Sequence, residues 1–431
     1  MKHTHKYVFV LLSINYILVD FITNQKPTKM TSQKTERLHA LDSLRAIMMM
    51  LGIVLHSANT YVVADYGASW PLKDPLSTSL YLDWISSFVH AFRMPIFFVV
   101  AGFFTSLLFH ERSSTKMIKN RVNRILLPFL VFVVLLWPLV TISFTYSNIV
   151  FAGGSNALST ALATFSQPSA FIPGHTMHLW FLYYLVLFSI TSYIVGLLFN
   201  KLPWFTSKSS QLVSFIIQRP LLKIIVFALI TFLLLLTMNR SWVATSLSFK
   251  PDFNTYIFYA FFYFFGWVLF KSKSLLSSFM NYDWVFSILG MILFTTYFLM
   301  DKSVLLLEVI MAIKSINVWL FIFGFTGLFI RFASTHSAVM RYVSDSSYWV
   351  YLLHLPLTAF LPGLLLGIAI PAFLKFVLVM TGTAFICFAT YHYFVRSSFI
   401  GKFLNGRKYS RKLKDIKPIV PLNETLKTAN A

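Results

Sequence analysis

The sequence predicts an all-α polytopic membrane protein with about ten transmembrane helices. Three observations support this fold class: 57% of the 431 residues are hydrophobic, only 12% are charged, and ten long apolar runs follow one another from residue 41. Soluble domains are about 45–50% apolar and about 25% charged, so a soluble globule is excluded. A disordered chain is excluded as well, because it requires low hydrophobicity.

Each apolar run has the length of a membrane span. A bilayer core of about 30 Å requires about 20 apolar residues in helical form, and a helix satisfies the backbone N–H and C=O groups within its own span. Several runs contain an internal Pro or Gly, which membrane helices tolerate. In chain order, the expected spans are residues 41–64, 80–108, 122–147, 178–199, 221–239, 253–270, 282–300, 313–333, 346–366 and 370–395.

Basic residues alternate between the two sides of these spans. Residues 24–40 before the first span, the segments after each even-numbered span and the tail carry 26 Lys and Arg, whereas the other five loops carry 6. By the positive-inside rule, both ends of the ten-helix core are expected in the cytoplasm of a bacterial-type inner membrane. The same rule, together with anionic membrane lipids, accounts for the net charge of +22, so we expect no nucleic-acid partner. The single Cys387 excludes an internal disulfide framework.

Arg45 and His56 are ionisable residues within the first span. They are eleven residues apart, which is about 1100° of helical rotation, so both side chains lie on one face and about 16 Å apart along the axis. Ionisable groups in the hydrocarbon region are costly and usually mark a functional site. The alternatives are that Arg45 is an anchor at the helix end and that His56 is a satisfied core histidine.

Three other spans also contain ionisable residues between mid-membrane and the outer surface. They are His90 and Arg93 in the second span, His178 at the start of the fourth and His354 in the ninth. The convergence predicts one polar cavity that opens outward, although structural hydrogen bonds or an aromatic belt would also accommodate single members. The histidines lack paired local spacing and nearby acidic ligands, so no metal is expected.

Five segments resemble motifs of the membrane-bound acyltransferase 3 family, in the family's order. They are LDSLRAIMMMLGIVLH, FVHAFRMPIFFVVAGFF, RVNRILLPFL, HLWFL and SYWVYLLHLPL. The resemblance covers residues 38–400 and is greatest to the branch that modifies osmoregulated periplasmic glucans. It implies an integral membrane O-acyltransferase that moves an acyl group, such as succinyl or acetyl, from a cytoplasmic acyl-CoA to a hydroxyl of an envelope carbohydrate.

The resemblance also implies roles for particular residues. His56 would be the catalytic histidine and Arg45 its essential partner. Arg93, His178 and His354, with His90 beside them, would bind substrate. Independently of the resemblance, four basic residues after the second span are candidates to attract the CoA phosphates, the alternative being plain positive-inside charge; these are Lys116, Lys119, Arg121 and Arg124. A neutral imidazole can take a proton from a sugar hydroxyl near neutral pH, which fits the role of His56.

The two ends of the chain lie outside the resemblance. Residues 1–29 are expected to be a signal-like segment or an extension upstream of a true start at Met30, and residues 401–431 a basic cytoplasmic tail. The main alternative function is a membrane transporter for an anionic solute, although no internal repeat of the kind common in transporters is visible. A third alternative is a structural membrane protein, which would leave the mid-membrane Arg93 without a purpose.

Overall fold

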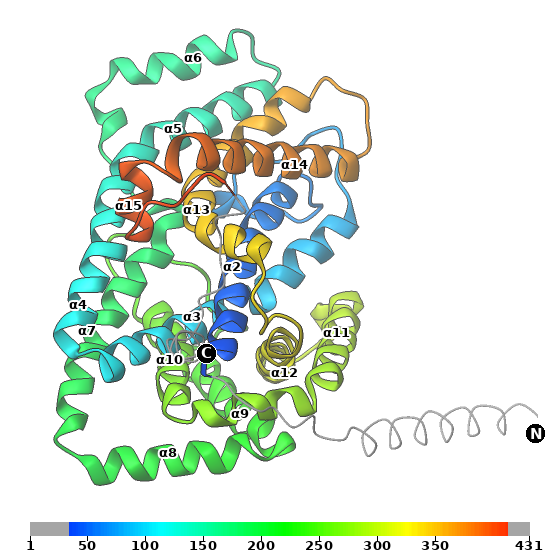
Figure 1. Ribbon diagram of the computed structural model, residues 1–431. Helices are drawn as coiled ribbons and strands as arrows, with labels where there is room; N and C mark the ends of the chain where they lie inside the picture. Colours follow the sequence, from blue (N-terminus) through cyan, green and yellow to red (C-terminus); the bar gives the residue numbers. More distant parts are fainter. Residues whose placement is uncertain (1–33, 413–431) are drawn as a thin grey trace, which may run out of the picture.

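The computed structural model describes residues 34–412, and within that range the fold is helical without strands (Figure 1). The helices that match the predicted spans are α2 (Lys34–Asn59), α3 (Leu80–Glu111), α5 (Leu127–Phe151), α7 (Trp180–Asn200), α9 (Pro220–Met238), α10 (Phe253–Lys271), α11 (Asp283–Leu299), α12 (Leu307–Phe332), α13 (Ala338–Leu365) and α14 (Ala372–Thr390). Four shorter helices accompany them: α4 (Ser114–Arg121), α6 (Ala157–Ala163), α8 (Pro203–Ile217) and α15 (Phe399–Asn405).

The predicted multi-pass architecture is confirmed. Among the described residues, nine helices are long and apolar enough to cross a membrane. The 3₁₀ segment Lys273–Asn281 and α11 form a tenth candidate, with a bend of 65° between them. The chain is therefore a multi-pass membrane protein, and the cytoplasmic position of its ends stays a prediction from the charge pattern.

The first span ends earlier than predicted, because a structured loop replaces its C-terminal end. Helix α2 ends at Asn59 instead of residue 64. The next amides leave the helical pattern: Val63 N and Ala64 N donate to the carboxylate of Asp83 at 2.6 and 2.9 Å. Because the carboxylate of Asp83, at the start of α3, already accepts hydrogen bonds from these amides, continuing α2 would add no backbone hydrogen bond.

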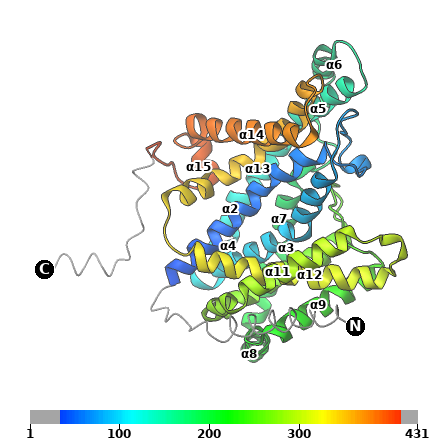
Figure 2. The same cartoon turned by 90° about the vertical axis from the view of Figure 1, so that its right-hand side faces the viewer.

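Helix α2 is the central element of the bundle. It packs against α3, α12, α13 and α14, and it runs beside α13 in both views (Figures 1 and 2). The two glycines Gly102 of α3 and Gly266 of α10 bring another pair of helices into close contact. A Cβ at Gly102 would overlap the carbonyl of Tyr263, and one at Gly266 would overlap the carbonyl of Val99.

The start of the predicted tail folds back onto the bundle. The guanidinium of Arg124 donates to the carbonyls of Lys402 and Phe403 at 3.0 and 2.8 Å, near the end of α15. The predicted N-terminal extension 1–29 and the tail residues 413–431 lie outside the described residues.

Candidate active site

The structure brings together four of the ionisable residues predicted from the sequence. His56 lies in the last turn of α2, Arg93 in α3, His178 just before α7 and His354 in α13. The ring centres of His56 and His354 are 5.2 Å apart, and those of His354 and His178 are also 5.2 Å apart. The expected convergence of these helices is therefore confirmed.

His354 has a defined hydrogen-bonding pattern. Its Nδ1 lies 2.7 Å from the carbonyl oxygen of Tyr351, one turn earlier in α13. Because a carbonyl can only accept, Nδ1 carries the hydrogen, and in the neutral ring Nε2 keeps its lone pair. Nε2 is buried and makes no hydrogen bond with the described residues. The ring thus presents a buried acceptor to the centre of the cluster.

His178 is fixed to α13 in the same manner. Its Nε2 donates to the carbonyl of Leu352 at 3.1 Å, and the hydroxyl of Tyr351 donates to the backbone carbonyl of His178 at 2.6 Å. Its Nδ1 is a second buried acceptor without a hydrogen bond from the described residues. The preceding Met177 has a φ of 50°, an uncommon left-handed conformation for a residue other than glycine, at the turn that leads into α7.

Arg93 reaches the cluster across the backbone of α2. Its Nε donates to the carbonyl of Met48 at 2.9 Å, and its side chain is buried. A Cβ at Gly52 would lie 2.7 Å from the Arg93 Nη2 and 3.2 Å from the His354 Nε2. The absence of a side chain at Gly52 therefore allows the guanidinium and the imidazole to meet against α2.

Arg45 and His56 mark the two ends of one stripe on α2. The stripe runs through Met48 and Gly52, which contact Arg93. At the far end from His56, the Arg45 guanidinium pairs with Asp42 at 3.1 Å. Helix α2 is unbroken between Arg45 and His56, which is consistent with the predicted common face.

A second guanidinium lies near Arg45. The Arg45 guanidinium is 5.5 Å from the ring centre of Phe104, and Arg121 donates from Nη2 to the hydroxyl of the next α3 residue, Thr105, at 2.7 Å. Two positive groups therefore gather at this end of the stripe. Anionic ligand groups would be attracted to it.

Trp70 covers His56 on the side away from Arg45. The indole stacks on the imidazole with 5.2 Å between ring centres and 24° between planes. Its Nε1 donates to Thr60 at 3.1 Å, and its ring contacts Phe144 of α5 edge-on. The predicted outward opening is thus covered by loop 60–79 in this structure. No periodicity distinguishes a tryptophan in such a loop, so sequence reasoning missed it.

A buried ion pair holds the same loop. Lys375 of α14 donates to Asp74 at 2.8 Å, with both side chains almost completely buried. Asp74 also accepts from the amides of Leu76 and Ser77. The loop is therefore a fixed cover rather than a free connection.

The remaining predicted residues lie outside the histidine cluster. His90 is exposed, and its Nδ1 lies 3.0 Å from the carbonyl of Ser86 in its own helix. Lys116 and Lys119 are exposed on α4. Arg124 is engaged with the end of α15, as described above.

The cluster combines groups suited to acid–base chemistry at an alcohol. An imidazole can accept the proton, and guanidinium N–H groups can donate to an oxyanion as its charge develops. Within residues 34–412, no group of three or more His, Cys, Asp or Glu side chains is placed to hold a metal ion.

Comparison with known proteins identifies relatives of this chain. The chain is similar to the glucans biosynthesis protein C of Escherichia coli strain K12, with 32% identity over 151 residues, 35% of this chain and 37% of the relative. It is also similar to the protein of that name from Salmonella paratyphi B, with 30% identity over 172 residues, 40% of this chain and 42% of the relative. The chain thus spans less than half the length of these relatives, and no solved structure matches.

The family comparison covers far more of the chain. A protein-family model described as an acyltransferase domain matches residues 38–392. This range includes the parts of all helices that contribute to the histidine cluster. The branch resemblance expected from the motifs agrees with the names of the relatives. The chain is therefore a member of the acyltransferase 3 family.

Proposed function

We propose that this protein is a membrane O-acyltransferase that moves an acyl group from a cytoplasmic acyl-CoA to a hydroxyl of a periplasmic or cell-envelope carbohydrate such as a glucan. The observation that carries the proposal is the contact of His56 with His354, beside the Arg93 guanidinium. The family match and the names of the relatives support acyl transfer and a glucan acceptor.

The reaction begins at the carbohydrate hydroxyl. His56 takes the hydroxyl proton while the oxygen attacks the thioester carbonyl carbon. Such general-base catalysis contributes about 10²–10⁴-fold to a rate. The carbonyl oxygen becomes an oxyanion, and Arg93, which lies one helical turn from His56 at Gly52, donates N–H groups to it.

The intermediate then collapses. The C–S bond breaks, the ester remains on the carbohydrate, and the CoA thiolate takes the proton from the His56 imidazolium. No net proton is consumed, so the histidine is neutral again for the next cycle.

Arg45 has a different role because of its distance. It lies about 16 Å along α2 from His56, which is too far for contact with the reacting carbonyl. Its guanidinium and that of Arg121 instead attract anionic groups of the donor at the predicted cytoplasmic end. The membrane would be the inner membrane of a bacterial cell, in which donor and acceptor lie on opposite sides.

A transfer assay tests this function against transport. Purified protein in liposomes is given succinyl-CoA or acetyl-CoA labelled in the acyl group, together with an envelope glucan. The proposal predicts ester-linked label on the glucan and release of free CoA. Label that accumulates inside the vesicles without ester formation would favour a transporter of an anionic solute.

A further inference from the structure

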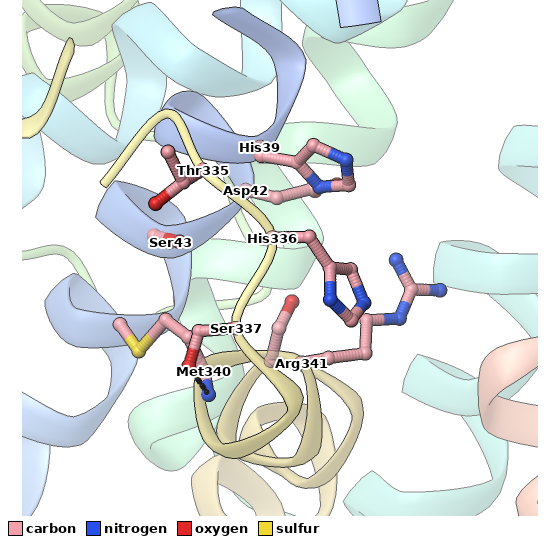
Figure 3. Close-up of a pocket in the computed structure, with 9 residues that line it drawn as sticks. His39, Asp42, Ser43, Thr335, His336, Ser337, Met340 and Arg341 are labelled. Carbon is pink, nitrogen blue, oxygen red and sulfur yellow. Dashed lines mark hydrogen bonds between the residues drawn. The ribbon is translucent and has the colours of Figure 1, made fainter. Parts of the chain in front are cut away.

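A pocket lies at the opposite end of α2 from His56. It is formed between the start of α2, the start of α13 and the segment that joins α12 to α13; its cavity volume is about 20 Å³ and it is partly open to solvent (Figure 3). The lining residues are His39, Asp42, Ser43, Thr335, His336, Ser337, Met340, Arg341 and Ser344.

The lining of the pocket is rich in hydrogen-bond donors. His39 and His336 contact each other edge to face with 5.8 Å between ring centres, and they project toward the same side as Arg341 in Figure 3. Hydroxyl groups of serine and threonine complete the wall. Imidazole, guanidinium and hydroxyl groups together are suited to the oxygens of a phosphate.

Among the described residues, Asp42 in the pocket wall and Asp345 beside it are already paired with guanidinium groups. Asp42 contacts Arg45 at 3.1 Å, and Asp345 contacts Arg341 at 3.2 Å and Arg396 at 3.6 Å. Each negative charge is thus matched by at least one guanidinium. An incoming anion therefore meets a site whose acidic groups are neutralised.

The pocket and the histidine cluster lie at two ends of the same helix pair. Asp42 and His56 are fourteen residues apart on α2, and Met340 and His354 are fourteen residues apart on α13. Both intervals are about 21 Å of helix rise, and both bring the second residue back to about the same face as the first. Helices α2 and α13 run side by side (Figure 2), so the line of contact between them, called the seam below, extends from the end that carries the pocket to the end that carries the cluster.

We propose that this pocket binds the phosphate end of the acyl donor, whose thioester arm follows the seam between α2 and α13 to His56. The inference rests on the proposed function, since it takes the donor to be an acyl-CoA. CoA carries its phosphates and its thiol at opposite ends of a long pantetheine arm, which fits a seam of about 21 Å.

Ligand binding to the purified protein tests the pocket. The double variant His39→Gln/His336→Gln is compared with the wild type by calorimetry against CoA and against pantetheine, which lacks the nucleotide phosphates. We expect CoA affinity to fall at least 10-fold and pantetheine affinity to stay unchanged. The matched control is His392→Gln, a half-buried histidine outside the pocket that contacts Tyr342, and it should bind CoA as the wild type does.

Other outcomes would overturn the inference in distinguishable ways. Unchanged CoA affinity in the double variant, with a loss in Lys116→Gln/Lys119→Gln instead, would assign the phosphates to α4. A double variant that loses retention of anionic phospholipid in nanodiscs, but keeps CoA binding, would assign the pocket to a lipid headgroup. A wild-type protein that binds no CoA would refute the donor class of the proposed function as well.

Discussion

The imidazoles of His56 and His354 face each other in the interior of the bundle with 5.2 Å between their ring centres. The two residues come from helices nearly 300 positions apart in the chain. The proton of His354 is held on Nδ1 by the carbonyl of Tyr351, so its Nε2 is an acceptor. His56 therefore has a neighbour that can accept a hydrogen bond from a second hydroxyl of the carbohydrate and so orient the reacting hydroxyl toward His56.

Replacement of His354 by phenylalanine tests this neighbour. His354→Phe keeps a ring in the buried site and removes the Nε2 acceptor. We expect the transfer rate to fall by about 10²-fold, because loss of orientation at a reacting group has effects of that size. The measurement is the initial rate of label transfer to glucan at saturating donor. A folded variant with the wild-type rate would contradict the role of His354.

The contact at Gly52 gives a second prediction. Gly52→Ala places a methyl group 2.7 Å from the present position of the Arg93 Nη2 and must displace the guanidinium. We expect the rate to fall by about 10²-fold, since small displacements of positioning groups have large effects. The control is Gly382→Ala, whose methyl group would meet only Leu361 Cδ1 at an ordinary 3.5 Å. Equal rates for the two variants would exclude a positioning role for Arg93.

The ion pair beneath the covering loop predicts an effect on stability. Lys375→Met leaves the carboxylate of Asp74 buried without its cation, which typically costs about 3–5 kcal/mol. The melting temperature in detergent should fall markedly. Lys73→Met is the control, because Lys73 bonds the carbonyl of Val63 at an exposed position. A Lys375→Met variant that melts with the control would show that the pair does not hold the loop.

Helix packing at Gly266 gives a further stability prediction. A methyl group at this position would overlap the backbone of Val99, which cannot move aside like a flexible side chain. Gly266→Ala should destabilise the fold by about 1–3 kcal/mol or more, as overpacking does. Gly367→Ala, where nothing lies within 4 Å, is the matched control. Equal thermal stability of the two variants would show that α3 and α10 can separate at little cost.

Much of the fold could be predicted because membrane helices follow from length and hydropathy alone. The bilayer fixes both the length of a span and its backbone hydrogen bonding, so each of the ten runs corresponds to a helix. The ends agree within about five residues except at the starts of α2, α12 and α13, which lie six to eight residues earlier than predicted. The end of α2 was misplaced by about five residues. The position of this end depends on Asp83 of the next helix, which accepts hydrogen bonds from the amides of Val63 and Ala64. A contact between residues about 20 positions apart leaves no local pattern in the sequence.

The site could be predicted only in part, for a related reason. The cost of an ionisable group in lipid identified His56, Arg93, His178 and His354. Trp70 contributes through stacking, for which a sequence carries no comparable signal. The same cost also predicted a site role for His90, but its imidazole instead bonds the carbonyl of Ser86, one turn earlier in its own helix.

The role of His56 as the general base is tested most directly by the rate of acyl transfer in His56→Gln. Wild-type and variant proteins are compared with labelled acyl-CoA and glucan, with melting temperature and CoA affinity measured on the same samples. We predict that the variant folds and binds CoA as the wild type does, yet transfers label about 10²–10⁴-fold more slowly. A folded, CoA-binding variant that transfers label at the wild-type rate would contradict the mechanism.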